Sequence, residues 1–498
     1  MTGARWLVLV LALACAALAV WRLELGRAGL SITALDAGGT PATVWQLPAH
    51  DPAPVIVIAH GFAGSRQLME GFAQVLARAG YIAVTYDLQG HGRNPAPMSG
   101  DVNAISGTTT VLMDELGRVS DAALALPGAD GHLALVGHSM ASDIVIRQAI
   151  RDPRVQAVAA MSMFSLAVTA DQPRNLLTIA GAWEAALGAE ALRTLRLSDP
   201  DAQFGDTVGD PATGLARRAM LAPYAEHVGV IFSPVTLAAT RDWMDASFAR
   251  TPSDTTPLRR GGWIVLLLAS VIALGWPLAG ALRRWRAAAP PSQASSRRFL
   301  AATLIPAIAT PLILAPLHIN FLPVLVADYL AVHFLLYGAL ALLVLAQGGL
   351  VRLRLTDVLL AVPVAVLTIG LFGTAADHYA TAFSPGPARL PIIAAIMVGT
   401  VPFMLADAVL TSGGRAPLWR TLTTRTAALG SLGLAVLLNP GALFFLLIIL
   451  PIVLAWFLLF GLIAGWIGRA TWHPTAAGIG LGLFLGWALG VTFPMFAA

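Results

Sequence analysis

The stretch "LALVGHSMASDIV", residues Leu133–Val145, decides the fold. An apolar run with strand character climbs to Gly137, a serine follows two residues later, and helical spacing begins after it. A serine on such a strand-to-helix turn adopts a strained backbone, so the residues two before and two after it must be small. Gly137 and Ala141 meet this demand, although Ala replaces the usual second Gly. We therefore interpret Ser139 as a nucleophile; an incidental serine in a tight turn is the alternative.

Strand-like and helix-like segments alternate around this turn. "APVIVIAHG", "YIAVTYD", "HLALVG" and "VQAVAAMS" are continuous apolar runs, which are typical of parallel strands buried on both faces. "SRQLMEGFAQVLARAG" has helical spacing and ends at Gly80. The alternation predicts an α/β domain with a doubly wound, mostly parallel sheet over residues 30–250.

A second loop is expected beside the serine. "AHGFAGS" follows the first of these strands. In this arrangement the oxyanion hole takes one backbone N–H from that loop and one from the residue after the nucleophile. The donors are predicted to be Phe62 and Met140, while His60 is expected to be a structural residue of the loop.

The other two members of a catalytic triad are sought in the chain order serine, acid, histidine. Only His227 lies after Ser139 and before the long apolar block that ends the chain. "RNLLTIAGAWEAAL" reads as strand, glycine turn and helix, which makes Glu184 the predicted acid. Asp171 is the competitor and Glu190 a weaker one. The acid would hold the imidazole in the right tautomer and stabilise imidazolium without taking the proton.

The segment "HGFAGSRQLMEGFAQVLARAGYIAVTYDLQGHGRN" resembles the α/β-hydrolase superfamily, and especially the serine aminopeptidase S33 and monoglyceride lipase-like branch. The resemblance covers residues 54–243 and implies a serine hydrolase acting on esters, thioesters or amides. It also implies that Asp87 and the turn 90–92 support the fold. The family's lid usually lies between strands that here end near Met163 and begin near Asn175, a short connection. The lid is therefore expected to be absent, as in dienelactone hydrolase-like members, which leaves the pocket open.

The rest of the chain predicts a membrane protein. The sequence is 57% hydrophobic and 12% charged, against about a quarter charged in soluble domains. The apolar run Trp6–Trp21 is read as an uncleaved anchor over residues 1–22, with a cleaved signal peptide as the alternative. A Pro- and Thr-rich linker, 251–262, leads to a multi-span domain over 263–498 with seven or eight spans. The count is open because the run 427–438 is short.

Arginines set the expected orientation, since the chain contains no lysine. Arginine-rich connections between apolar runs alternate with arginine-poor ones such as "INF" and "NPG". The rich set lies at 283–298, 352–354, 415–425 and 469. The positive-inside rule places this set in the cytoplasm, so the hydrolase domain is expected outside it, at a bacterial inner or plasma membrane. Arg22, Arg27, Arg259 and Arg260 argue weakly for the opposite orientation.

The leading functional prediction is a membrane-bound serine hydrolase whose small-molecule or lipid substrate comes from the bilayer or cell envelope. The alternative is a transporter or flippase-like protein whose hydrolase-like domain only binds ligand. It is prompted by Asp328, His333 and Asp407, which fall within apolar runs. No metal-binding spacing, nucleotide loop or flavin fingerprint is present in the sequence, so neither metal nor cofactor is predicted. The clustering of arginine between spans argues against a nucleic-acid partner. The acyl group, the leaving group and the oligomeric state are left open.

Overall fold

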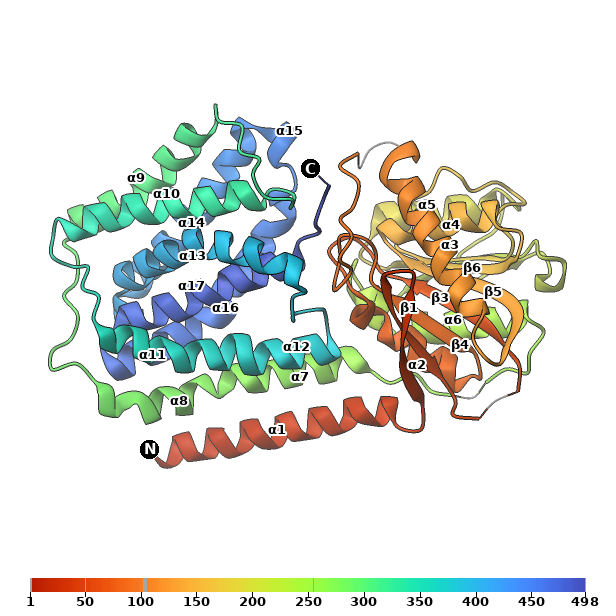
Figure 1. Ribbon diagram of the computed structural model, residues 1–498, viewed down its shortest axis with the longest axis horizontal. Helices are drawn as coiled ribbons and strands as arrows, with labels where there is room; N and C mark the ends of the chain where they lie inside the picture. Colours follow the sequence, from red (N-terminus) through yellow and green to blue (C-terminus); the bar gives the residue numbers. More distant parts are fainter. Residues whose placement is uncertain (1, 50, 102–104, 254, 498) are drawn as a thin grey trace. The chain divides into compact units, whose positions relative to one another are not determined.

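The computed structural model describes residues 2–49, 51–101, 105–253 and 255–497. The chain forms two compact units (Figure 1). The sheet unit consists of Ala19–Val265 with two distant segments, Asp377–Ala382 and Pro494–Ala498. The helical unit consists of Met1–Leu18, Leu266–Ala376 and Phe383–Phe493.

The sheet unit is built on a nine-stranded sheet in the order β1-β2-β4-β3-β5-β6-β7-β9-β8, counted over the described residues. Its strands are β1 (Ser31–Ala37), β2 (Thr40–Gln46), β3 (Ala53–Ala59), β4 (Ile82–Tyr86), β5 (Ala129–His138), β6 (Val155–Met161), β7 (Leu176–Gly181), β8 (Thr207–Val208) and β9 (Arg217–Ala222). The six strands from β4 to β9 in this order are parallel, and β1, β2 and β8 pair antiparallel at the two edges. The predicted doubly wound parallel sheet is thus confirmed.

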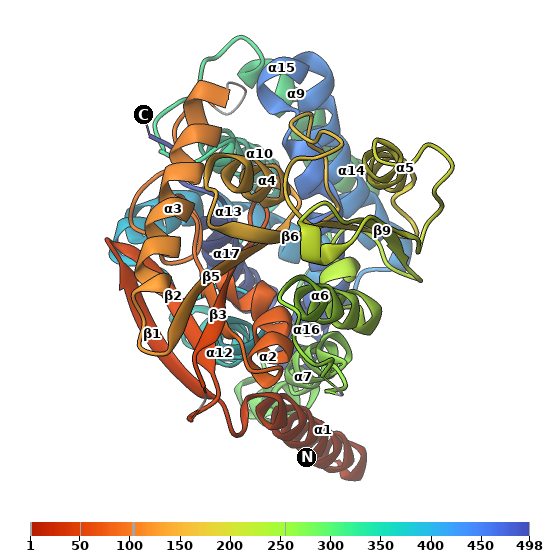
Figure 2. The same ribbon diagram turned by 90° about the vertical axis from the view of Figure 1, so that its right-hand side faces the viewer.

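The central strands are buried along their whole apolar length, because helices cover both faces of the sheet. All of β3 and β4 is buried. The covering helices are α2 (Glu70–Arg78), α3 (Thr110–Leu124), α4 (Met140–Arg151), α5 (Ala185–Arg196) and α6 (Pro234–Ser247). Helices α3 and α4 pack together on one face, and α2 and α6 on the other (Figure 2). Ile56, Phe72 and Leu177 lie in the apolar core.

Nine helical segments in the described residues are long and apolar enough to cross a membrane: Gly3–Arg27, Arg260–Trp285, Ser296–Leu314, Ala327–Ala346, Leu355–Tyr379, Pro387–Leu410, Leu418–Leu438, Leu450–Thr471 and Pro474–Thr492. They include α1 (Gly3–Arg27), α7 (Arg260–Ala273), α8 (Gly275–Ala281), α9 (Ser296–Leu314), α10 (Ala327–Ala346), α11 (Leu355–Ala365), α12 (Gly373–Tyr379), α13 (Leu390–Leu410), α14 (Leu418–Leu438), α16 (Leu446–Thr471) and α17 (Pro474–Thr492), with the short α15 (Pro440–Leu443) beside them. This pattern is consistent with a multi-pass membrane protein.

The short apolar run at 427–438 belongs to a full-length helix rather than a half-span. Helix α14 begins at Leu418. Its first turns contain polar residues, which is why only its second half stood out as an apolar run in the sequence. Polar side chains in those turns have partners: Thr424 Oγ1 donates to the Arg420 carbonyl of the same helix at 2.9 Å, and Arg425 Nε lies 3.5 Å from Asp407 Oδ1 of α13. Polar residues that find partners in this way are tolerated in an apolar helix.

Small residues bring α13 and α17 into close contact in the helical unit. Gly478, Gly482, Gly486 and Gly490 recur every four residues along one face of α17. A Cβ atom at Gly482 would lie 2.6 Å from Val401 Cα, and one at Gly490 would lie 2.5 Å from Ile393 Cγ1. Any side chain here would push the helices apart, which is the reason that small residues mark close helix packing in membranes.

Two segments far away in sequence complete the sheet unit. Segment Asp377–Ala382 contains the last residues of α12 and the start of the connection to the 3₁₀ helix η7 (Pro387–Arg389), and Pro494–Ala498 follows α17. The Ala382 N–H donates to Ser65 Oγ at 2.9 Å, and Arg260 donates to the Tyr379 carbonyl at 2.9 Å. Nothing in the sequence indicated these contacts, because they join residues more than 100 positions apart.

Candidate active site

Ser139 lies on a sharp turn between β5 and α4, in the conformation that the sequence predicted for an elbow. Its φ is 55° and its ψ is −122°, a strained backbone for a residue with a side chain. A Cβ at Gly137 would lie 2.6 Å from the Ala141 carbonyl oxygen, so only glycine fits there. The Ser139 N–H donates to the Met161 carbonyl of β6 at 2.9 Å, which anchors the turn to the sheet.

Three of the predicted site residues converge at the carboxyl edge of the sheet. His227 Nε2 lies 2.8 Å from Ser139 Oγ, and His227 Nδ1 lies 2.6 Å from Glu184 Oε1. The three residues follow β5, β7 and β9, which are parallel, so their loops meet at one edge. The competing acid, Asp171, instead accepts a hydrogen bond from Thr169 Oγ1 at 3.0 Å, and Glu190 pairs with Arg193. Glu184 is therefore the acid in contact with the histidine.

Two further donors hold the Glu184 carboxylate. Its Oε2 atom accepts from Ser162 Oγ and from the Gly181 N–H, each at 2.7 Å. The side chain is 7% exposed, so these bonds act in a water-poor setting where they fix its orientation. Sequence reasoning missed both donors. Ser162 ends the apolar run "VQAVAAMS". Its position directly after a predicted parallel strand was the one feature of the sequence that could have placed it near the site.

His138, directly before the nucleophile, is another residue that the sequence reasoning missed. Its Nε2–H donates to the His227 carbonyl at 2.8 Å, since a carbonyl oxygen can only accept. Burial lowers the pKa of His138 to about 4, although the hydrogen bond to His227 acts in the opposite direction. His138 is therefore neutral near pH 7 and holds the backbone of His227 in place.

His60 has the structural role that was predicted for it. Its Nδ1–H donates to the Gly61 carbonyl at 2.8 Å, and its Nε2 accepts from the Leu88 N–H at 3.1 Å. These partners fix the neutral tautomer with the proton on Nδ1. Burial lowers the pKa of His60, which agrees with a neutral ring.

The loop that carries the predicted oxyanion donor Phe62 passes directly against Ser139. A Cβ at Gly61 would lie 2.9 Å from Ser139 Cβ, so glycine permits this approach. The Gly64 N–H donates to the Gly61 carbonyl at 3.0 Å and closes a tight turn around Phe62. The second predicted donor, Met140, is the first residue of α4. Phe62 thus follows the glycine that lies against Ser139, and Met140 directly follows Ser139 itself.

Large apolar side chains surround this edge and face solvent. Phe164, Leu166, Trp183 and Tyr224 are 59%, 77%, 68% and 87% exposed, and we call them the apolar rim. They follow β6, β7 and β9; the loops after β7 and β9 also carry Glu184 and His227. The connection 162–175 between β6 and β7 contains no helix. The described residues of this connection therefore leave no room for a lid domain between β6 and β7.

No group of three or more histidine, cysteine, aspartate or glutamate side chains suited to holding a metal lies in the described part of the chain. The geometry around Ser139 can support nucleophilic attack with proton transfer by a neighbouring imidazole. Such an arrangement works without a bound metal, because the base and the acid are both side chains.

Residues 50–210 match the family model described as serine aminopeptidase, S33. No curated protein matches the chain. Among solved structures, the chain is similar to E-2-(acetamidomethylene)succinate hydrolase, with 17% identity over 44% of this chain and 100% of that one and a TM-score of 0.32. Dienelactone hydrolase from Anabaena variabilis matches at 17% identity over 44% of this chain and 95% of that one, with a TM-score of 0.31. An epoxide hydrolase from Vigna radiata matches at 23% identity over 27% of this chain and 40% of its own length, with a TM-score of 0.22.

Similarity at this level does not transfer a substrate. The family match covers about a third of the chain and includes Ser139 and Glu184, but stops before His227. The sheet order and the match to the family model agree. The sheet unit of this chain is an α/β-hydrolase domain.

Proposed function

We propose that this protein is a membrane-bound serine hydrolase that cleaves an ester, thioester or amide through an acyl-enzyme on Ser139. One observation carries the proposal: an unbroken hydrogen-bonded line from Ser139 Oγ through His227 to Glu184. The strained elbow presents the serine at the end of a strand, where a substrate carbonyl can approach.

In the proposed reaction, Ser139 Oγ attacks the substrate carbonyl carbon while His227 Nε2 takes the hydroxyl proton. Glu184 stabilises the imidazolium that forms. The N–H groups of Phe62 and Met140 stabilise the oxyanion, and each donor contributes about 3–4 kcal/mol in well-studied enzymes. His227 then gives the proton to the leaving group, whose bond to the carbonyl carbon breaks. Water attacks the acyl-enzyme in the same way, with His227 as base, and releases the acid and free Ser139.

The apolar rim favours a substrate with an apolar acyl or alkyl chain. Trp183 and Tyr224 belong to the loops that also carry Glu184 and His227. Exposed aromatic groups cost free energy in water and gain it when they cover an apolar chain. A lipid or envelope lipid ester offers such a chain, and a protein with many candidate membrane spans operates where these molecules are concentrated.

The chain topology supports an extracytoplasmic hydrolase domain. If the nine helices cross in turn, the hydrolase domain, the connection after Tyr379 and the chain end after Thr492 all lie on one membrane face. Segments Asp377–Ala382 and Pro494–Ala498 of the sheet unit come from that connection and that chain end. The arginine-rich connections fall on the other face, which the positive-inside rule assigns to the cytoplasm.

The polar groups that prompted the transporter alternative have partners inside the helical unit. Asp407 lies 3.5 Å from Arg425, and His333 lies 3.2 Å from Ser431 Oγ. Asp328 accepts from the Tyr329 N–H at 2.7 Å. Partnered groups of this kind are needed for helix packing alone, so they give no support to a transporter whose hydrolase-like domain only binds ligand.

A fluorophosphonate probe, which reacts covalently with activated serines, tests the proposal on membranes that contain the full chain. The wild type is expected to label, and Ser139→Ala is expected to lose labelling. Ser198→Ala is the matched control, because Ser198 Oγ bonds only the Ala170 carbonyl among the contacts of the described residues. Folded wild type that stays unlabelled, or Ser139→Ala that still labels, would overturn the proposed nucleophile.

A further inference from the structure

Four arginines and two tryptophans of the helical unit line one open pocket of about 260 Å³. The pocket is formed by Arg5, Trp276, Arg283, Arg286, Trp466 and Arg469, with Ala470. Arg5 begins α1, Arg283 and Arg286 follow α8, and Arg469 lies in the last turn of α16. Three separate parts of the chain therefore converge on one cationic pocket, which has no part in the proposed hydrolytic site.

The positive charge of this pocket has no ion-pair partner among the described residues. None of its four arginines forms an ion pair with a carboxylate of residues 2–49, 51–101, 105–253 or 255–497. Four like charges in one small pocket repel one another, and a bound anion relieves that repulsion. A guanidinium group binds phosphate through two parallel hydrogen bonds, so phosphate is the anion that this set fits best.

Packing against aromatic rings and small residues holds these side chains in place. Arg5 lies over the Trp276 ring, with Cζ 5.7 Å from the ring centroid. Arg286 lies over Trp472 at 3.4 Å. A Cβ at Gly280 would lie 2.6 Å from Arg5 Cδ, and one at Gly465 would lie 2.8 Å from Arg469 Nη1. Because glycine has no side chain, Arg5 can lie against α8 at Gly280, and Arg469 can lie against α16 at Gly465.

The position of the pocket along the chain indicates a lipid rather than a free phosphate. Arg5 lies at the start of the first candidate span, Arg283 lies near the end of the second with Arg286 just after it, and Arg469 lies near the end of the eighth. These three helix ends fall on one membrane face if the nine helices cross in turn. Tryptophan is enriched at the level of lipid headgroups, and basic pockets between spans bind anionic headgroups.

We propose that this pocket binds the phosphate-bearing headgroup of an anionic membrane lipid. The lipid would lie with its phosphate among the arginines and its acyl chains along the apolar helices. The site is a binding site, distinct in residues and in chemistry from Ser139 and its partners. It would tie the end of α1 to the ends of α8 and α16, and so stabilise the helical unit.

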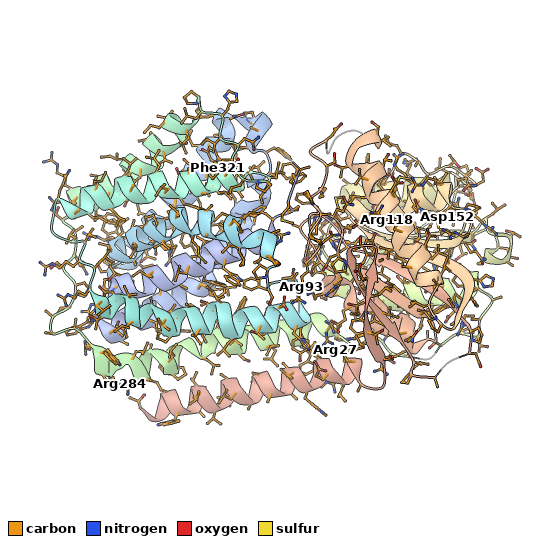
Figure 3. The ribbon with its side chains drawn as sticks, viewed as in Figure 1. Arg27, Arg93, Arg118, Asp152, Arg284 and Phe321 are labelled. Carbon is orange, nitrogen blue, oxygen red and sulfur yellow. The ribbon has the colours of Figure 1, made fainter. Side chains whose placement is uncertain are left out.

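The test uses the full chain purified in detergent and thermal unfolding with added lipid. The double variant Arg283→Gln with Arg286→Gln removes two pocket charges. The control, Arg284→Gln with Arg297→Gln, removes two exposed charges from the same connection (Arg284 is labelled in Figure 3). Phosphatidylglycerol is expected to raise the unfolding temperature of wild type and control saturably. Its apparent affinity for the pocket variant is expected to fall at least about tenfold, since a hydrogen bond to a charged group contributes strongly.

Added inorganic phosphate and phosphatidylcholine separate the sources of binding. Neither is expected to stabilise the wild type at the concentration at which phosphatidylglycerol does. Equal weakening in the pocket variant and the control would mean diffuse attraction to surface charge and would overturn the proposal. Stabilisation by inorganic phosphate alone would overturn the lipid assignment. Unfolding of each variant without lipid measures any folding defect separately.

Discussion

Replacing Glu184 by glutamine tests the candidate triad most sharply, because the structure fixes which way the new amide must point. Glu184 Oε2 accepts from the Gly181 N–H and from Ser162 Oγ. The backbone N–H of Gly181 cannot become an acceptor, so the amide oxygen of the substituted side chain must take this position. The amide NH₂ then faces His227 Nδ1, which lies 2.6 Å from the carboxylate in the wild type.

A donor at that position requires an unprotonated Nδ1, so the imidazole proton moves to Nε2. Nε2 is the atom that lies 2.8 Å from Ser139 Oγ and must accept its proton. The base is therefore in the wrong tautomer. The equivalent Asp→Asn change in Ser-His-Asp proteases lowers kcat about 10,000-fold, so a loss of that order is expected here. This corresponds to about 5 kcal/mol of activation free energy.

The assay is the rate of fluorophosphonate labelling of Ser139, together with kcat and KM on a p-nitrophenyl ester. A fall in labelling rate and kcat with KM nearly unchanged is expected. Asp171→Asn is the matched control, because Asp171 bonds Thr169 rather than His227, and it should keep wild-type rates. Activity of Glu184→Gln within about tenfold of wild type, or a large loss in Asp171→Asn, would refute the assignment of the acid.

Three further changes probe the rim, the buried histidine and the distant segment. Trp183→Ser should lower kcat/KM for long-chain esters about tenfold, from lost apolar contact, and leave acetate esters nearly unchanged; equal losses on both would contradict the role of the rim. The pKa of His138 is about 4 when folded and about 6.5 when unfolded, so the unfolded chain binds the extra proton between these values. Stability should therefore fall by about 3 kcal/mol as pH drops from 6.5 to 4, and thermal unfolding of His138→Gln should show a smaller pH dependence. Ser65→Ala leaves the Ala382 N–H without its hydrogen-bond acceptor and should lower the free energy of unfolding by about 1–3 kcal/mol. An unchanged unfolding temperature would mean that this hydrogen bond does not contribute to stability.

The sequence by itself determined the fold class and singled out Ser139 as the candidate nucleophile. The reason is local: a buried parallel strand needs a continuous apolar run, and a serine elbow needs small residues at fixed offsets from Ser139. His227 could be found because chain order left a single histidine in the right interval. The apolar runs predicted the long apolar helices for the same local reason, since length and hydropathy belong to each segment alone.

Tertiary structure alone decided between Glu184 and Asp171, because the choice depends on which of two loops at the sheet edge reaches His227. It also showed that Ser162 contacts Glu184 and that His138 contacts His227. The long helix α14 was likewise hidden, because Arg425 in its polar part is paired with Asp407 of another helix. The placement of segment Asp377–Ala382 in the sheet unit could not be predicted from the sequence, because it depends on hydrogen bonds to side chains more than 100 positions away. Local sequence carries periodicity and steric limits, whereas such contacts depend on how the whole chain returns on itself.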